Sequence, residues 1–149
     1  MSRGFAYVSG YDENDIPLPV RKTPGSAGYD LAAAADLVLA AQRVTLAPTG
    51  IKAYMGADEY LGLHIRSGLA VKQGLMLVNG QGIIDSDYYD NPDNGGHILI
   101  GIYNPGSQPV AIAKGTRIAQ GIFYKYLLAD QDVCATDSRK GGLGSTGEQ

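Results

Sequence analysis

The chain has 149 residues, the length of one ordinary domain, and 44% of them are hydrophobic, which excludes a disordered chain. Fifteen acidic residues outnumber 12 basic ones and give a net charge of −3, so a broad basic surface for nucleic-acid polymers is not expected. The single cysteine, Cys134, cannot form an internal disulfide, and the longest apolar stretch, residues 31–41, is too short to span a membrane. We therefore expect a soluble, cytoplasmic protein.

Apolar residues recur with a period of two along the chain, which predicts short β-strands. The pattern is clearest in residues 60–66 and 98–103, and it recurs in the shorter segments 44–46, 51–54, 110–112 and 118–122. Turn sequences with glycine or proline separate these segments, and the chain holds 21 glycines and seven prolines. Many short strands joined by tight turns are typical of a β-sandwich, a jelly roll or a small barrel.

Two segments compete with this all-β interpretation. Residues 32–35 are four consecutive positions with high helix propensity, and residues 67–73 fit one or two helical turns with Ser67 as a possible N-cap. The last stretch is rich in glycine, serine and threonine and predicts a flexible tail. We expect one domain over residues 1–135, followed by a mobile arm over residues 136–149.

Five polar, glycine-bearing segments are candidates for chemistry. They are residues 25–31 (GSAGYDL), 66–68 (RSG), 79–88 (NGQGIIDSDY), 117–120 (RIAQ) and 139–147 (RKGGLGSTG). Each has an ordinary structural explanation when taken alone: a turn, a capped helix start, an acidic surface turn, a plain strand and a disordered tail. The fourth, as a strand, would place residues 117 and 119 on one face and residues 118 and 120 on the other.

The residue types in these segments also suit binding of a metal, of phosphate and of a flat heterocycle. Asp30 is a carboxylate that could hold a hydrated Mg²⁺, and Arg66 beside a helix start could bind phosphate. A tight hairpin at Asn79-Gly80 could read the edge of a flat heterocycle with its backbone. Asp85 and Asp87 would share a face on a strand, and one of them could orient a water as general base.

Together and in this order, the five segments resemble the five motifs of the trimeric dUTPase family, the dUTP nucleotidohydrolases. The resemblance extends from about Ile16 to Gly147. It implies an all-β, jelly-roll-like β-barrel of the β-clip type with one short helix and a flexible C-terminal arm. It also implies a homotrimer with sites shared between subunits, in which residues 136–149 close over a neighbouring subunit's site.

The activity that the resemblance implies is Mg²⁺-dependent hydrolysis of dUTP to dUMP and pyrophosphate. Water would attack the α-phosphorus in line, and the reaction would keep uracil out of DNA and supply dUMP. Asp85 would position and activate this water, and Asp30 would hold Mg²⁺ through water. Tyr88 would lie flat against the deoxyribose, leaving no room for a 2′-hydroxyl, and Leu99 would lie beside the sugar or base.

The resemblance assigns the remaining roles as follows. Phosphates would be bound by Arg66, Ser67, Gly68 and Gln120. Uracil would be recognised by Asn79 and by the backbone of Gly82, Ile83 and Ile84. The arm residues that would order over the β- and γ-phosphates are Arg139, Leu143, Gly144, Ser145 and Thr146.

The chain departs from the family pattern at two places. Leu143 stands where the family usually has an aromatic residue that caps the uracil ring. After Tyr88 the family commonly continues with Arg-Gly, whereas here residues 89–96 (YDNPDNGG) form a longer segment.

Two other functions fit the same fold. A dCTP deaminase-type relative would need a second acidic residue near the pyrimidine amino group, and Asp87 is a poor candidate for that part. A non-catalytic nucleotide-binding or regulatory module would not need Asp85 and Tyr88, which are both present.

Overall fold

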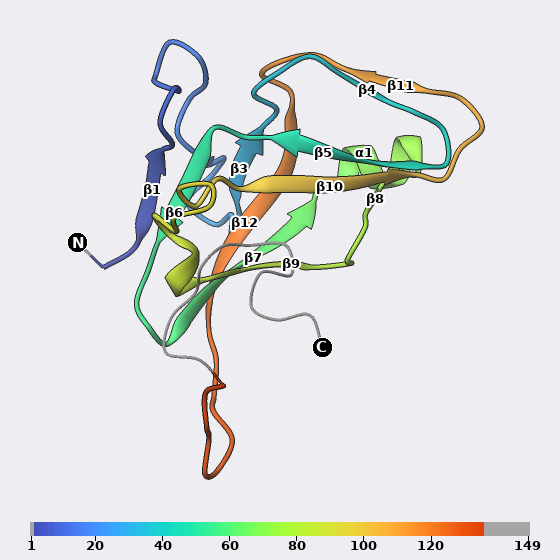
Figure 1. Ribbon diagram of the computed structural model, residues 1–149. Helices are drawn as coiled ribbons and strands as arrows, with labels where there is room; N and C mark the ends of the chain where they lie inside the picture. Colours follow the sequence, from blue (N-terminus) through green and yellow to red (C-terminus); the bar gives the residue numbers. More distant parts are fainter. Residues whose placement is uncertain (1, 136–149) are drawn as a thin grey trace.

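The computed structural model describes residues 2–135 and consists of short strands with little helix (Figure 1). The first six strands are β1 (Gly4–Tyr7), β2 (Val20–Arg21), β3 (Tyr29–Ala32), β4 (Leu37–Leu39), β5 (Arg43–Pro48) and β6 (Ile51–Tyr54). The others are β7 (Glu59–Ile65), β8 (Met76–Leu77), β9 (Gly82–Asp85), β10 (Leu99–Asn104), β11 (Val110–Ile112) and β12 (Arg117–Lys125). One α-helix, α1 (Ser67–Gln73), and one 3₁₀ turn, η1 (Ser86–Tyr88), complete the described part. The expected all-β fold with one short helix is confirmed.

The largest sheet has five antiparallel strands in the order β2-β3-β12-β7-β9. Its longest member, β12, runs beside β7 through the middle of the molecule (Figure 1). A three-stranded sheet, β5-β10-β8, and the pairs β1-β6 and β4-β11 make up the rest. Over residues 2–135 the strands thus form four separate sheets rather than one continuous closed barrel.

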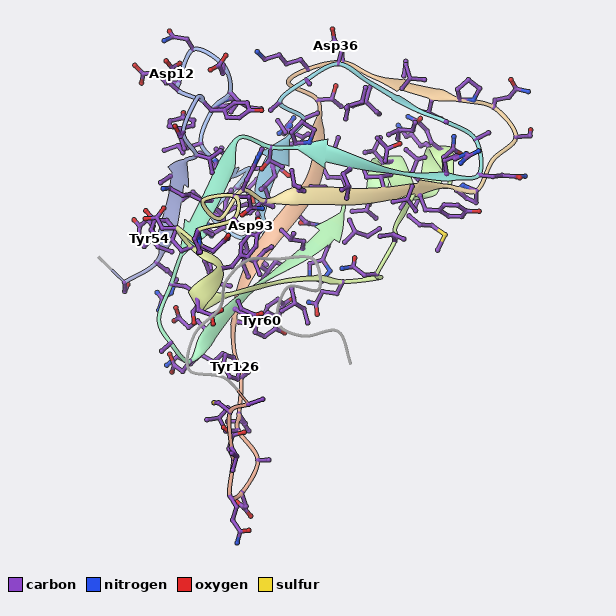
Figure 2. All side chains as sticks on the ribbon, viewed as in Figure 1. Asp12, Asp36, Tyr54, Tyr60, Asp93 and Tyr126 are labelled. Carbon is purple, nitrogen blue, oxygen red and sulfur yellow. The ribbon has the colours of Figure 1, made fainter. Side chains whose placement is uncertain are left out.

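Buried and partly exposed side chains alternate along the strands, and the buried ones form the core. On β10, Ile100 and Ile102 are buried while their neighbours are partly exposed, and on β7 Leu61 and Leu63 point inward. Side chains at the opposite face of the large sheet include Tyr60, which lies against Tyr126 at one end of β7 and β12 (Figure 2). The strands predicted at residues 60–66 and 98–103 are confirmed as β7 and β10, with bounds shifted by one residue. Their alternating apolar side chains fix which face of each strand points inward.

The segment at residues 32–35 is not a helix. Ala32 ends β3, and the next two residues donate backbone hydrogen bonds to distant partners, Ala33 to Thr116 O and Ala34 to Pro48 O, both at 2.8 Å. All of this stretch up to Ala34 is buried, so tertiary contacts override its helix propensity.

The helix predicted at residues 67–73 is present, but Ser67 is not its N-cap. Arg66 occupies that position with an extended backbone, and no side chain caps the helix start. Gly74 ends the helix in the left-handed conformation, φ 67°, which glycine adopts without strain. Within the described residues no helix has both the length and the apolar character needed to cross a membrane.

The Asn79-Gly80 turn is present, but the strands around it do not pair with each other. Gly80 has φ 72° and donates its N–H to Leu77 O at 3.0 Å. β8 then pairs with β10, whereas β9 pairs with β7. The expected two-stranded hairpin is therefore wrong, because the two arms of the turn join different sheets. β9 becomes an edge strand in the described part of the chain, with one side of its backbone turned away from the ladder.

Candidate active site

Four residues predicted to bind phosphate or metal gather around one cavity, whereas Gly68 does not line it. Its volume is about 140 Å³, and its lining consists of Lys22, Ser26, Gly28, Asp30, Arg66, Ser67 and Gln120. Strand register explains the gathering, because Gln120 on β12 is opposite Asp30 on β3 and opposite His64 on β7. Arg66 and Ser67 follow directly after β7, so they emerge at the same end of the sheet.

Asp30 is held between two arginines. Its Oδ1 lies 3.5 Å from Arg66 Nε, and its Oδ2 accepts a hydrogen bond from Arg117 Nη1 at 3.2 Å. The Asp30 side chain is only 12% exposed, so both contacts are partly shielded from water. This arrangement fixes the carboxylate between two cations, of which Arg66 also lines the cavity.

Arg117 reaches Asp30 because the strand alternation expected over residues 117–120 is broken. A β-bulge interrupts β12 between Arg117 and Ala119, and both Ile118 and Ala119 are fully buried. The expectation that residues 118 and 120 share a face is therefore wrong. The extra residue instead lets Arg117 and Gln120 both approach Asp30.

Arg66 also lines a second cavity, with a volume of about 260 Å³. Its lining consists of Arg66, Gly68, Leu69, Lys72, Gln73 and Arg117. Gly68 has open space where a side chain would begin, so the first turn of α1 is accessible there. Four cationic side chains, Lys22, Arg66, Lys72 and Arg117, line these two cavities, which suits a polyanion.

The donor set fits Mg²⁺ held through water but not by direct chelation. Within residues 2–135 no group of three or more His, Cys, Asp and Glu is close enough together to bind a metal ion. Asp30 is a single carboxylate already paired with two arginines. Mg²⁺ usually keeps several waters and uses one or two carboxylates together with substrate phosphates, which this cavity can accommodate.

A second group of predicted residues surrounds a smaller, mainly apolar cavity of about 80 Å³. Its lining consists of Leu46, Leu63, Leu77, Val78, Asn79, Gly82, Leu99, Ile100 and Gly101. The structure thus brings together Asn79, Gly82 and Leu99, which come from a turn, β9 and β10. Of the other two residues predicted to read the base, Ile84 packs against the core and Ile83 is 57% exposed.

Tyr88 and Asp85 lie at the far end of β9. Tyr88 is buried, and its hydroxyl donates to His97 O at 2.8 Å. Asp85 is the last residue of β9, but Asp87 lies in the 3₁₀ turn that follows. The expectation that these two aspartates share a strand face is therefore wrong, because the strand ends between them.

The two groups are well separated within one chain. From Asp30 to Asp85 there are three strand steps across the large sheet and four residues along it, since Asp30 is level with His64 and Asp85 with Tyr60. At about 4.8 Å per step and about 3.3 Å per residue, the backbones are about 20 Å apart. One copy of the described chain therefore does not bring Asp85 to the cavity at Asp30.

The ionisable groups with shifted pKa values lie outside these cavities, and among them are Glu59 and His97. Hydrogen bonds from Arg3, reinforced by the Gly56 N–H, lower the pKa of Glu59 to about 2. Burial lowers the pKa of His97, whose Nε2 accepts a hydrogen bond from Gly50 N at 2.8 Å. Both groups hold loops to strands, so their shifts reflect structure rather than reaction chemistry.

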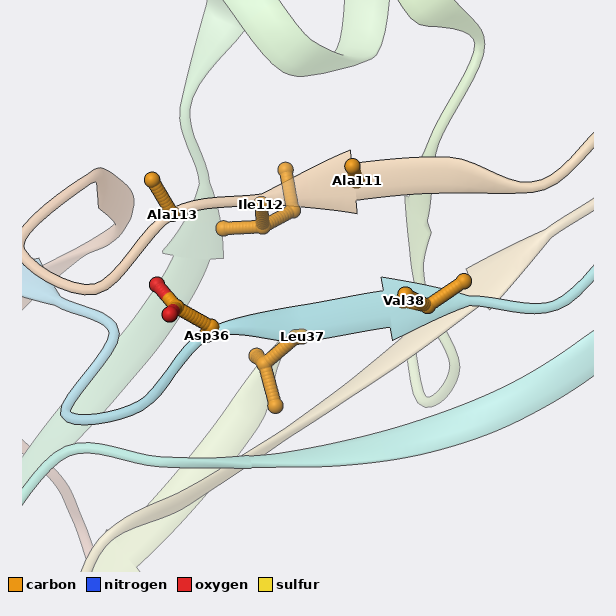
Figure 3. Close-up of a pocket in the computed structure, with 6 residues that line it drawn as sticks. All are labelled: Asp36, Leu37, Val38, Ala111, Ile112 and Ala113. Carbon is orange, nitrogen blue, oxygen red and sulfur yellow. The ribbon is translucent and has the colours of Figure 1, made fainter.

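A further hollow follows the paired strands β4 and β11 and contains none of the predicted residues (Figure 3). Its volume is about 330 Å³, and its lining consists of Asp36, Leu37, Val38, Ala111, Ile112 and Ala113. The one charged member, Asp36, accepts a hydrogen bond from the backbone N–H of Lys114 at 2.7 Å. This apolar groove offers no cation for phosphate.

The last group of predicted residues belongs to the C-terminal arm. Arg139, Leu143, Gly144, Ser145 and Thr146 lie outside the described residues. Their roles, and the division of the chain at residue 136, stay predictions.

Comparison with known proteins decides the family. A sequence model of the dUTPase family matches residues 14–147. The chain belongs to the dUTPase family. The deoxyuridine 5'-triphosphate nucleotidohydrolase of Lactococcus lactis subsp. lactis (strain IL1403) is 46% identical over 146 residues, which cover 97% of each chain. The protein of the same name from Escherichia coli O9:H4 (strain HS) is 39% identical over 142 residues, covering 91% of this chain and 90% of its own.

The fold agrees with this assignment. The solved structure of the dUTPase from Streptococcus mutans is 43% identical and has a TM-score of 0.81, covering 85% of this chain and 98% of that one. The sequence-based expectations of a dUTPase family member, of a jelly-roll-like dUTPase fold and of a dUTP diphosphatase are confirmed.

Three residues at or beside the cavity around Asp30 had no role assigned from sequence. Lys22 and Ser26 line it beside Asp30, and Arg117 pairs with that carboxylate. Ser26 lies within the first glycine-bearing segment, which was a usable signal. Arg117 likewise lies within the fourth segment, although no role was assigned to it. Lys22 carried no such signal, because surface lysines are common and only the fold brings this one to the cavity.

Proposed function

We propose that this dUTPase hydrolyses dUTP to dUMP and pyrophosphate by in-line attack of water at the α-phosphorus, with Mg²⁺ as cofactor. The observation that carries the proposal is the cavity at Asp30, Arg66, Ser67 and Gln120, which gathers donors for phosphate in a chain of this family. Membership of the family supports dUTP as the substrate. The cavity supports binding of the triphosphate, which is the part of dUTP that reacts.

The phosphate end uses charge that is already in place. The Arg66 guanidinium offers a fork of N–H donors to phosphate oxygens, with Ser67, Gly68 and Gln120 as further donors. Charge develops on these oxygens as water attacks, so fixed donors stabilise the transition state more than the bound substrate. Asp30 keeps Arg66 aligned at 3.5 Å. When bound, Mg²⁺ would add charge neutralisation at the phosphates, with Asp30 holding its water shell.

The base end relies on backbone and shape. The outer edge of β9 over Gly82, Ile83 and Ile84 offers N–H and C=O groups that can pair with uracil, beside the Asn79 side chain. A site that must satisfy or reject hydrogen-bonding groups discriminates more strongly than an apolar pocket. Leu99 supplies an apolar wall next to the same cavity.

Asp85 acts as the general base that positions and activates the attacking water. Its location at the end of β9, next to Tyr88, puts it beside the sugar of a nucleotide whose base lies along that strand. Asp85 and Asp30 are about 20 Å apart within one chain. The residues that bind the phosphates of this nucleotide must therefore come from a neighbouring subunit. A homotrimer with shared sites satisfies this requirement.

Exposed apolar residues support the assembly. Beyond β12 the chain extends away from the sheets, and Leu127 and Leu128 are 96% and 68% exposed (Figure 1). Adjacent apolar side chains in water are typical of surfaces that a partner covers. The arm over residues 136–149, with Arg139 and the glycine-rich residues, continues from this segment and would close over a neighbour's triphosphate.

The first test is pyrophosphate release with Mg²⁺ from dUTP, dTTP, dCTP and UTP, with EDTA as the metal control. Turnover of dUTP alone, lost in EDTA, is expected. Deamination of dCTP would instead show a deaminase, and binding of dUTP without turnover would show a nucleotide-binding module.

Asp85→Asn tests the general base. We expect it to retain dUTP binding and to lose about 10²–10⁴ in turnover. Asp93→Asn, an equal charge change at an exposed position, is the matched control and should keep the rate. A near-normal rate for Asp85→Asn would exclude the assigned role.

Mixing two inactive variants tests the shared site. Arg66→Gln damages the phosphate end and Asp85→Asn the base end, so a hybrid trimer contains some sites built from two intact halves. Random 1:1 mixing after unfolding and refolding should restore about one quarter of the wild-type rate. If both halves of a site came from one chain, the mixture would stay inactive.

A further inference from the structure

The Tyr88 hydroxyl is held from two sides. It donates to His97 O at 2.8 Å and accepts a hydrogen bond from Asn94 Nδ2, also at 2.8 Å. Asn94 belongs to the longer segment that follows Tyr88 in this chain, and His97 directly follows that segment. A tyrosine fixed at its backbone and at its hydroxyl has little freedom to tilt its ring.

Asn94 is itself fixed by a closed amide network. Its Oδ1 accepts from Asn91 Nδ2 at 2.9 Å and from Gly96 N at 3.1 Å. Asn91 is 5% exposed, and its Nδ2 also donates to Tyr88 O at 2.8 Å. Asn91 Oδ1 accepts the N–H groups of residues 93 and 94. The Asn91 amide thus uses all four of its hydrogen-bonding positions.

The backbone of the segment packs closely against the backbone of residues 88–90. Gly95 and Gly96 have φ of 67° and 86°, a region that favours glycine. A Cβ on Gly96 would come within 2.9 Å of Tyr88 O and 3.0 Å of Asp90 N, so only glycine lets the chain fold back this closely.

Contacts to the strands anchor both ends of the segment. At its start, Asp90 forms an ion pair with Lys52 on β6, and the Tyr89 ring packs edge-on against Tyr54 with 5.9 Å between centroids. At its end, His97 accepts a hydrogen bond from the backbone N–H of residue 50, and residue 98 donates to residue 51 at 2.8 Å. The segment is a bracket on β6 rather than a free surface loop.

We propose that residues 89–97 form a rigid bracket that fixes the Tyr88 ring, and that Asn94 is the positioning residue through which this chain rejects ribonucleoside triphosphates. The inference rests on the proposed function, in which the Tyr88 ring lies against the deoxyribose. Excluding one 2′-hydroxyl requires a wall that does not yield by a few tenths of an ångström. Asn94 supplies that stiffness without touching the substrate.

The test is the ratio of kcat/KM for dUTP to kcat/KM for UTP in the full-length enzyme. Asn94→Ala removes one of the two hydroxyl partners and should lower this ratio about fivefold or more, mainly through better use of UTP. Tyr88→Phe keeps the ring and removes both hydroxyl bonds, so it should lower the ratio at least as much. The double variant should have the same ratio as Tyr88→Phe alone, because both changes break the same hydrogen-bond network.

Asp93→Ala is the matched control. Its side chain is exposed, and only its backbone N–H joins the network, so the ratio should stay at the wild-type value. Thermal unfolding of each variant separates a loosened ring from an unfolded protein. Because Tyr88→Phe keeps the packed ring, it carries the test if Asn94→Ala does not fold.

The outcomes separate this inference from the proposed function. A wild-type enzyme that does not hydrolyse dUTP would refute the proposed function. A wild-type enzyme that discriminates, together with a folded Asn94→Ala and a Tyr88→Phe whose ratios stay within about twofold of it, would overturn the bracket alone.

Discussion

Gly28→Ala tests whether close packing between β12 and the chain just before β3 aims Gln120 into the phosphate cavity. A Cβ added at Gly28 would lie 2.9 Å from Gln120 Cβ and 3.1 Å from Gln120 Cδ, and would overlap Oε1. The amide end can rotate away, but Cβ is fixed to the backbone of β12. The alanine must therefore push the two chain segments apart and turn the Gln120 amide out of the cavity.

Two magnitudes follow. Overpacking of this kind costs about 1–3 kcal/mol, which for a chain of this size lowers the unfolding midpoint by about 2–10 °C. A lost hydrogen bond to a charged phosphate costs about 1.5–3 kcal/mol, so kcat/KM for dUTP should fall by about tenfold or more. Scanning calorimetry measures the first quantity and pyrophosphate release the second.

Two comparisons make the prediction sharp. Gly25→Ala is the matched control, because a Cβ there meets nothing within 4 Å and should change neither quantity by more than a small amount. Gln120→Ala should lose as much activity as Gly28→Ala, and the double variant should lose no more. Gly28→Ala behaving like Gly25→Ala in both assays would refute the packing argument.

Three further predictions concern stability. Because Arg3 lowers the pKa of Glu59 from 4.5 to about 2, stability should be full above about pH 4.5 and fall as pH drops towards 2; Glu59→Gln should flatten this slope in acid titrations of unfolding. Burial lowers the pKa of His97, so stability should also fall as pH drops below 6.5; an unchanged slope in His97→Gln would contradict this cause. Ile118→Ala, at a fully buried position, should cost about 2–5 kcal/mol in urea unfolding, whereas Val71→Ala, 83% exposed, should cost under about 0.5 kcal/mol.

The strands and the helix were predictable because their signals are local. Period-two alternation over residues 60–66 and 98–103 states which side chains face the core, and the structure buries those same residues. The short helix at residues 67–73 ends where Gly74 allows a left-handed residue. Such features depend on neighbours in sequence, so composition and spacing suffice to find them.

Features that depend on strand pairing were not predictable from local pattern. The bulge at residues 117–119 moves Arg117 towards Asp30, yet a regular strand has the same sequence signature. The Asn79-Gly80 turn marks a reversal of the chain, but not that its arms enter different sheets. Both outcomes are decided by partners far away in sequence.

The segment after Tyr88 shows the same limit in a different way. The sequence Asn91-Pro92-Asp93-Asn94-Gly95-Gly96 predicts turns, and turns are present. The pattern does not state that the two asparagine amides face inward and hold a tyrosine. Asparagine in a turn commonly bonds its own backbone, so only the fold distinguishes a bracket from an ordinary surface turn.

The register of the strands sets the distance between the two halves of the site, the phosphate end at Asp30 and the base end at Asp85. Asp30 is level with His64, and Asp85 lies four residues further along the same sheet. The Tyr124 ring lies over Gly62, where an added Cβ would come within 2.6 Å of Cε2, and its hydroxyl is 3.1 Å from His64 Nε2. A slip of one residue would turn these side chains to the other face and break each contact. In the proposed trimer, Asp85 of one copy meets phosphates bound by Asp30 and Arg66 of another copy. The packing of Tyr124 against Gly62 and His64 therefore fixes the spacing between these two halves within each chain.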